Sequence, residues 1–235
     1  MKKLASVFIL AGFAASAAAA APSYIKRDAG SGYKVTYDYK DKEKGGWYAA
    51  LRAQLNLLSW ENTYFSDYVG YSGGDKYSMK PVFGGSLSFG KRFDYFWRVE
   101  LEAGYTGMFT DEGQGMEFNF SIPYLLANAM YDFSNGLYLG GGLGAAFPMT
   151  TWKGDLFLPG GRTKVAVSPM AGLMAGYVHK LDDNMVLDLR YRIAGFNGSK
   201  HTRNFEDLSS IQYYFESKIG LVLENSFSVA LRYEF

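Results

Sequence analysis

The residues of this sequence most able to carry chemistry are Arg, Asp and Glu side chains two positions apart. Arg98, Glu100 and Glu102 form one such series, and Asp188, Arg190 and Arg192 form another. A spacing of two places side chains on one face of a β-strand. Because each face carries both signs of charge, the sequence predicts a polar network between strands. The predicted members are Arg52, Gln54, Asn56, Arg98, Glu100, Glu102, Asp188, Arg190, Arg192, Arg232 and Glu234, with Glu117 as a further candidate.

Few residues of the sequence are of types suited to catalysis. The chain has 2 His and 0 Cys, which excludes a thiol nucleophile and a zinc–thiolate site. A pairing of Ser199 with His201 could attack an acyl group, and Asp111 and Glu112 are weaker partners for His201. No third group is identified that would orient the imidazole. We therefore expect no enzymatic activity, cofactor or metal, and keep a rim enzyme acting on lipid A or peptides as an alternative.

The elements that must position the charged residues are strands. From 97 to 109, apolar side chains such as Trp97, Val99 and Leu101 alternate with the charged ones. A period of two over this length is typical of a β-strand. Comparable alternation appears at 47–59, 82–92, 116–133, 137–148, 164–180, 185–196 and 211–235.

Two of these segments leave detail open. In 116–133 the alternation fits best with Phe118, Phe120 and Ile122 on the apolar outer face and a bulge near Pro123 that changes the phase. In 211–235 either one long strand or a hairpin at 224–226 would explain the pattern. The first interpretation gives eight strands in total and the second gives ten.

The N-terminus indicates export. Lys2 and Lys3 precede an apolar stretch that ends in small residues, which is typical of a signal peptide over 1–20 with cleavage after Ala20. Residues 21–46 form a polar leader, and 47–235 form the folded domain. No later segment is apolar enough for a spanning helix. The net charge of +1 gives no indication of nucleic-acid binding.

The connections between strands alternate in length. Short ones are predicted at 93–96, 134–136 and 182–184, and long ones at 61–79, 110–115, 150–163 and 197–210. This alternation is typical of outer-membrane barrels. The predicted fold is therefore an all-β, transmembrane, antiparallel up-and-down β-barrel of eight strands, with ten as the alternative.

Energetics and aromatic placement orient the two faces. An Arg or Lys that faces lipid at mid-bilayer costs about 2–4 kcal/mol, so the charged face should line the lumen. Aromatic residues gather at both strand ends, as two membrane girdles would require. The short-turn girdle includes Trp47, Trp97 and Tyr138, and the long-loop girdle includes Trp60, Phe109, Phe118 and Phe196.

The chain resembles the small outer-membrane β-barrel superfamily of opacity-type porins and OmpA/OmpX-like barrels. The segments that carry this resemblance are 46–48, 127–133, 187–192 and the terminal 229–235. The resemblance implies insertion into the outer membrane of a Gram-negative bacterium. It also implies that Tyr233 and Phe235 belong to the signal for the barrel-assembly machinery.

An eight-stranded barrel has an interior that side chains can fill. The sequence therefore favours a structural and surface-interaction role, in envelope integrity and in adhesion through the four long loops. A narrow porin-like channel for small solutes is the alternative. The expected partners are outer-membrane lipid and lipopolysaccharide, the assembly machinery and a surface or host ligand, with the chain as a monomer.

Overall fold

The structure is a computed structural model that describes residues 46–66, 71–93, 96–113, 116–154, 158–206 and 212–235. Among these residues no helix is long and apolar enough to cross a membrane. The predicted signal peptide 1–20, its cleavage site at Ala20 and all but the last residue of the leader lie outside them, so these stay predictions. The strands are β1 (Trp47–Ser66), β2 (Tyr71–Arg92), β3 (Trp97–Gly113), β4 (Met116–Asp132), β5 (Leu137–Ala146), β6 (Met149–Gly154), β7 (Leu158–Val165), β8 (Ser168–Lys180), β9 (Met185–Asn197), β10 (Lys200–Glu206), β11 (Gln212–Ile219) and β12 (Leu221–Glu234).

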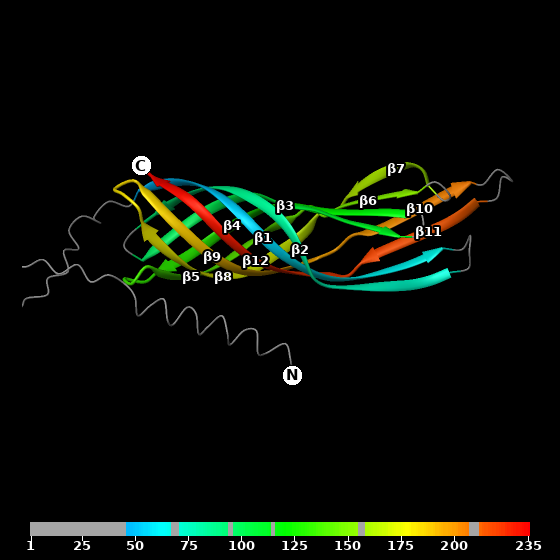
Figure 1. Cartoon of the computed structure of the whole chain (residues 1–235), viewed down its shortest axis with the longest axis horizontal. Coiled ribbons are helices and arrows are strands. Elements are labelled where there is room, and N and C mark those ends of the chain that lie inside the picture. Colours follow the sequence, from blue (N-terminus) through cyan, green and yellow to red (C-terminus); the bar gives the residue numbers. More distant parts are fainter. Residues whose placement is uncertain (1–45, 67–70, 94–95, 114–115, 155–157, 207–211) are drawn as a thin grey trace, which may run out of the picture.

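Eight of these strands close into a ring (Figure 1). Their order is β1, β2, β3, β4, β5, β8, β9 and β12, and β12 pairs with β1 to close the sheet. Every pairing is antiparallel. The predicted eight-stranded antiparallel barrel is confirmed.

Both ends of the described chain meet at the short-turn end of the ring. The backbone N–H of Phe235 donates to the carbonyl of Trp47 over 2.9 Å. The turn at 134–136 lies at the same end and contains Gly136, whose φ of 87° suits glycine. The long connections therefore emerge at the opposite end, which is the extracellular end of an outer-membrane barrel.

The prediction that the four long connections at that end are loops is wrong. Most of their residues continue the ring strands or form the additional strands β6, β7, β10 and β11. Antiparallel hairpins satisfy backbone N–H and C=O groups that a loop would leave to water.

Beyond the ring the strands separate into two sheets. Outer sheet A is β2–β1–β11–β10, and outer sheet B is β3–β4–β6–β7. The pairing of β2 with β3 stops at Gly84 and Thr106. Among the described residues no backbone ladder joins the two outer sheets above that level.

Two local predictions are also wrong. No bulge interrupts β4 at Pro123; the irregularity lies on β3, between Thr106 and Phe109. As a result Phe118, Phe120 and Ile122 keep the inward phase of β4. No hairpin forms at 224–226 either, because that segment pairs with β9 inside the single strand β12.

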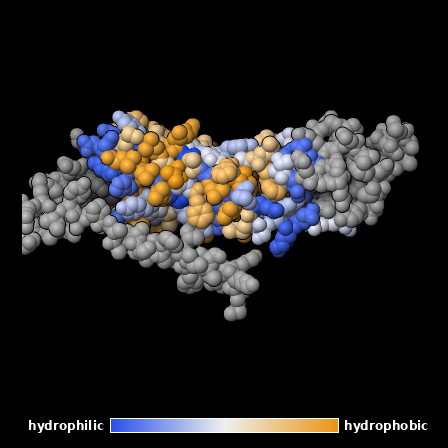
Figure 2. All heavy atoms as spheres, in the orientation of Figure 1, coloured by the Kyte–Doolittle hydropathy of each residue, from blue (hydrophilic) through white to orange (hydrophobic). Residues whose placement is uncertain are grey.

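The outer face of the ring is apolar. Leu51, Phe83, Leu143 and Leu173 are among its exposed side chains. Figure 2 shows most of the hydrophobic atoms gathered over the ring, with hydrophilic atoms at its two ends. A lipid environment would cover this belt, and the predicted inside and outside faces of the strands are confirmed for these residues.

Candidate functional site

The lumen of the ring holds the charged residues singled out in the sequence. It is filled in two layers, an ionic layer near the short turns and an apolar layer toward the outer sheets. The ionic layer buries Arg52, Gln54, Asn56, Arg98, Glu100, Glu102, Asp188, Arg190, Arg192 and Arg232. Glu234 lies at the short-turn rim with 26% of its side chain exposed. Glu117 lies in outer sheet B, where its carboxylate accepts a hydrogen bond from Asn119.

Two glutamates of β3 form the centre of the ionic layer. Arg190 Nη1 lies 2.8 Å from Glu100 Oε1 and 3.0 Å from Glu102 Oε2. Arg192 Nη1 lies 3.1 Å from Glu102 Oε1, and Arg52 Nη1 lies 3.4 Å from Glu102 Oε2. Three strands of the ring, β1, β3 and β9, are thus tied together across the lumen by charge. Breaking such a buried pair on one side leaves an uncompensated charge.

The ionic layer continues toward both ends of the ring. Near the short turns Arg98 Nε lies 3.0 Å from Asp132 Oδ1, and Arg232 Nη2 lies 2.8 Å from Glu234 Oε1. Toward the outer sheets Arg192 Nη2 lies 2.8 Å from Glu224 Oε1. The other oxygen of this carboxylate, Oε2, accepts a hydrogen bond from the hydroxyl of Thr106. The layer therefore spans the ring from its rim to the end of the β2–β3 ladder.

The charges of the ionic layer balance. Its buried charged members are Arg52, Arg98, Arg190, Arg192, Arg232, Glu100, Glu102, Asp132, Asp188 and Glu224. Equal numbers of the two signs neutralise each other in a site that excludes most solvent. A ring of one sign, which would select ions, is not formed by these described residues.

Three buried tyrosines orient the carboxylates. The hydroxyls of Tyr48, Tyr124 and Tyr138 donate to Glu100 (3.1 Å), Glu102 (2.8 Å) and Asp188 (2.6 Å). Their rings lie under guanidinium groups, as with Arg98 at 4.3 Å from the Tyr138 centroid. The prediction of Tyr138 as an outward girdle residue is wrong, because its position on β5 has the inward phase.

Sequence reasoning missed several members of this layer. Asp132 and Glu224 were not assigned to the lumen, although both have the inward parity of their strands. Tyr48 and Tyr124 share that parity with charged neighbours. The alternation therefore carried the signal for these residues, and of the three tyrosines only Tyr138 was predicted to lie in a girdle.

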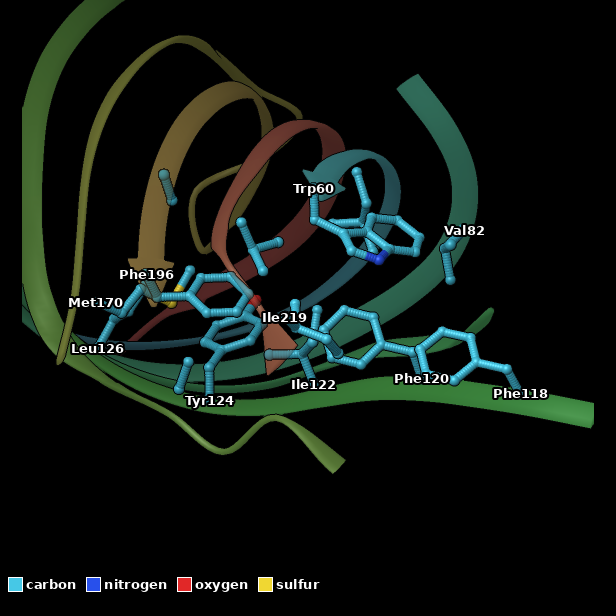
Figure 3. Packing of buried hydrophobic residues seen from close by; sticks show 14 residues of the cluster. Trp60, Val82, Phe118, Phe120, Ile122, Tyr124, Leu126, Met170, Phe196 and Ile219 are labelled. Carbon is cyan, nitrogen blue, oxygen red and sulfur yellow. The ribbon is translucent and has the colours of Figure 1, made fainter. Parts of the chain in front are cut away.

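The apolar layer fills the lumen between the ionic layer and the outer sheets. Figure 3 shows side chains from several strands pointing into the same space. Trp60 stacks on Tyr77 with centroids 4.5 Å apart and lies 5.4 Å from Phe120. The buried members are Leu58, Trp60, Val82, Phe118, Phe120, Ile122, Tyr124, Leu126, Ala146, Met170, Ala194, Phe196, Ile219 and Val222.

This layer overturns the predicted outer girdle. Trp60, Phe118 and Phe196 are buried in the lumen, and Phe109 packs against the same cluster. Each has the inward phase of its strand at this level. Their burial removes large apolar surfaces from water. Apolar side chains thus occupy the part of the lumen that faces the outer sheets.

The structure describes the side chains of two of the residues considered for catalysis, Ser199 and Asp111. Ser199 is buried, and its hydroxyl lies 3.0 Å from that of Thr150. Asp111 belongs to outer sheet B and accepts a hydrogen bond from Tyr77 over 2.7 Å. His201 and Glu112 lie on β10 and β3, but their side chains are outside the described part. Within that part no group of three or more His, Asp or Glu side chains could hold a metal.

The chain is similar to several solved structures of outer-membrane proteins. No protein-family model matches the sequence, and no curated protein matches it significantly. Among solved structures, the attachment invasion locus protein Ail of Yersinia pestis, in complex with the heparin analogue sucrose octasulfate, is 17% identical, with a TM-score of 0.45 over 82% of this chain and 99% of that one. The outer membrane protein OprG from Pseudomonas aeruginosa is 15% identical, with a TM-score of 0.45 over 83% and 98%. The outer membrane protein AlkL is 16% identical, with a TM-score of 0.48 over 91% and 96%. These likenesses concern the fold alone.

Proposed function

We propose that the protein is a closed outer-membrane β-barrel that anchors two outer sheets at the cell surface, in a structural and surface-interaction role. The exposed apolar belt supports the membrane location. A soluble barrel would leave Leu51, Phe83 and Leu143 in water. A large contiguous apolar patch on a protein surface indicates contact with a membrane or with another protein. The closed ring satisfies its own backbone groups, as a bilayer requires.

The observation that carries the proposal is that two layers of side chains, one ionic and one apolar, fill the lumen. Arg190 and Glu102 belong to a layer of paired charges, and Trp60 and Phe120 to an apolar layer above it. An ion crossing this lumen would have to break buried ion pairs and then enter an apolar region, which is costly at each step. The barrel therefore supports structure and display better than transport.

The two competing functions have less support. A narrow channel would need a continuous polar path, and the apolar layer interrupts it. A rim enzyme would need an accessible nucleophile, and Ser199 is buried and hydrogen-bonded. Among the described residues no specific contact supports a channel or a rim enzyme.

The proposal includes partners for the barrel itself. Tyr233 and Phe235 are exposed at the end of β12, with their rings 5.3 Å apart. Their position on the outer face leaves them accessible to the assembly machinery during insertion. Outer-membrane lipid would surround the ring of a single chain, and surface ligands would meet outer sheets A and B.

A genetic experiment tests this role. The gene is removed from its own bacterium and restored either as wild type or with the β6–β7 hairpin, residues 150–164, replaced by a short turn. Wild type should restore resistance to detergent and attachment of cells to surfaces. The shortened variant should restore detergent resistance and lose attachment, because the ring does not depend on that hairpin. Unchanged resistance and attachment in the deletion strain, together with reduced solute uptake, would contradict the proposal and support transport.

A further inference from the structure

A group of charged side chains lies at the short-turn end of the ring, where the lumen faces the periplasm in the proposed orientation. We call it the periplasmic mouth, and its members are Arg92, Arg98, Asp132, Arg232 and Glu234. Asp132 Oδ1 lies 3.0 Å from Arg98 Nε, and its Oδ2 lies 3.7 Å from Arg92 Nη2. Glu234 Oε1 lies 3.3 Å from Arg92 Nη2 and 2.8 Å from Arg232 Nη2. Three guanidinium groups thus share two carboxylates.

The positive excess of the periplasmic mouth is local. Asp188 Oδ2 lies 3.7 Å from Arg98 Nη1, but it also lies 3.5 Å from Arg52 Nη2 and 3.6 Å from Arg190 Nη2. This carboxylate therefore belongs mainly to the deeper part of the lumen. The buried charges there are four carboxylates and three guanidinium groups, from Glu100, Glu102, Asp188, Glu224, Arg52, Arg190 and Arg192. The two parts together are neutral, and the end toward the periplasm is positive.

The buried guanidinium groups of the periplasmic mouth also have free donors. Among the described residues no acceptor takes a hydrogen bond from Arg98 Nε, Nη1 or Nη2, or from Arg232 Nε or Nη1. The two side chains are only 0% and 1% exposed. Arg190, by contrast, donates hydrogen bonds through all three of its side-chain nitrogens. Because buried polar groups in proteins are nearly always hydrogen-bonded, the free donors point to an acceptor from outside the chain.

The geometry leaves an entrance to these donors. Arg98 Cζ lies 4.3 Å from the centroid of the Tyr138 ring, and Arg232 Cζ lies 5.1 Å from that of Tyr48, so both groups are held against aromatic rings. Arg92 ends β2 at the short-turn rim, and its side chain is the most exposed of the three, at 21%. An anion from the periplasm would meet Arg92 first and would reach the other two guanidinium groups once that side chain moves aside.

We propose that the periplasmic mouth binds a small oxyanion, a phosphate or a carboxylate, between Arg92, Arg98 and Arg232. Guanidinium groups present planar pairs of N–H donors that match the oxygens of both kinds of anion. The bound anion would accept hydrogen bonds that Asp132 and Glu234 leave unmade, and it would neutralise the local positive excess. The inference goes beyond the proposed function, because it adds a ligand on the periplasmic side of a barrel that stays closed.

Titration of the full chain, refolded in non-ionic detergent, tests the proposal. The probes are inorganic phosphate and succinate at constant ionic strength, and the arginine Nε–H signals are followed by NMR. At least one probe should shift the signals of Arg98 and Arg232 and reach saturation. Arg92→Gln should bind that probe at least about tenfold more weakly, as expected for the loss of one charged hydrogen-bond donor. Lys180→Gln is the control and should bind as wild type, because this rim lysine is 60% exposed and paired with Asp183.

Glu234→Gln separates anion binding from a purely structural set of ion pairs. Removing this carboxylate frees donors of Arg92 and Arg232 and increases the positive excess, so the affinity for the probe should rise. Four results would overturn the inference: shifts that sodium chloride reproduces, shifts that do not saturate, unchanged or weaker binding in Glu234→Gln, and equal binding in Arg92→Gln and Lys180→Gln.

Heat-modifiable gel mobility shows whether each variant is folded. Conductance of the wild-type protein tests the closed barrel separately. A failed titration of folded, electrically silent protein would therefore overturn the anion site alone, whereas a conducting wild-type barrel would contradict the proposed function.

Discussion

Gly104 on β3 lies directly against the ring of Tyr124 on β4. A Cβ atom at position 104 would lie 2.1 Å from Tyr124 Cζ, closer than any side chain could tolerate. The hydroxyl of Tyr124 in turn donates to Glu102, at the centre of the ionic layer. The same relation links Gly90 to Tyr48 and Gly176 to Tyr138. These glycines make room for the tyrosines that orient the carboxylates.

Replacing Gly104 by Ala should therefore destabilise the barrel. The new methyl group must displace the Tyr124 ring and weaken its bond to Glu102, and overpacking of this kind costs about 1–3 kcal/mol. Urea unfolding in detergent micelles, followed by tryptophan fluorescence, would measure the loss. Gly141→Ala is the control, since its nearest contacts are at 3.6 Å. Equal unfolding midpoints for the two variants would contradict the packing described.

Glu102→Gln should be more damaging than any change to a surface pair. It keeps the size of the side chain but removes a charge shared by Arg52, Arg190 and Arg192. Removing one partner from a buried ion pair costs about 3–5 kcal/mol. Lys76→Ala, which breaks an exposed pair with Glu61, should cost less than about 1 kcal/mol. The comparison uses the same unfolding assay, and a smaller effect for Glu102→Gln than for Lys76→Ala would rule out a tightly coupled ionic layer.

The ring and its charged face could be predicted because alternation along a strand has only two phases. Arg98, Glu100 and Glu102 could face lipid only at high cost, which fixed the inward face of β3. The same rule fixes the inward face of β9 through Asp188, Arg190 and Arg192. The pairing of β12 with β1 then requires eight strands rather than ten.

The apolar layer could not be predicted by residue type. Trp60, Phe118 and Phe196 were assigned to a girdle because aromatic residues favour membrane interfaces. Their positions on β1, β4 and β9 have the same inward phase as the charged residues below them. Parity was thus the better guide than hydrophobicity, since an apolar side chain can be buried in a lumen as well as in lipid.

The outer sheets were missed for a different reason. Segments such as Tyr71–Lys76 on β2 are rich in Gly and charge, which is typical of loops. Their strand conformation comes from pairing with a neighbour, as Thr63 pairs with Gly74 and with Lys218. Local sequence does not encode such nonlocal support.

Phe120→Ala should create a cavity in the apolar layer. Phe120 is completely buried, and truncating a buried Phe costs about 3–5 kcal/mol. Phe83→Ala is a matched control, because that side chain is 79% exposed on the outer face. Phe120→Ala should lose more than about twice as much unfolding free energy as Phe83→Ala, because truncating the buried ring leaves a cavity. An equal loss would mean that Phe120 does not pack inside the lumen.

Glu216, on the outer sheet formed in part by β10 and β11, should titrate below the ordinary range of a glutamate. The hydrogen bond from Tyr214, followed by that from Lys200, lowers the pKa of Glu216 below its ordinary value. A depressed carboxyl pKa stabilises the folded state above the ordinary pKa, and this contribution is lost as pH falls through the folded value. Tyr214→Phe should therefore shift the pKa of Glu216 upward, as NMR of the labelled carboxyl carbon would show. An unchanged or lower pKa would contradict the contact.

The most direct test of the closed lumen is single-channel conductance of the refolded full-length domain in a planar bilayer. Heat-modifiable gel mobility serves as the folding control. Because Arg190 and Glu102 are paired below an apolar layer that contains Trp60 and Phe120, the folded protein should be electrically silent. Discrete, reproducible current steps from folded wild-type protein would contradict the account and show that the lumen conducts.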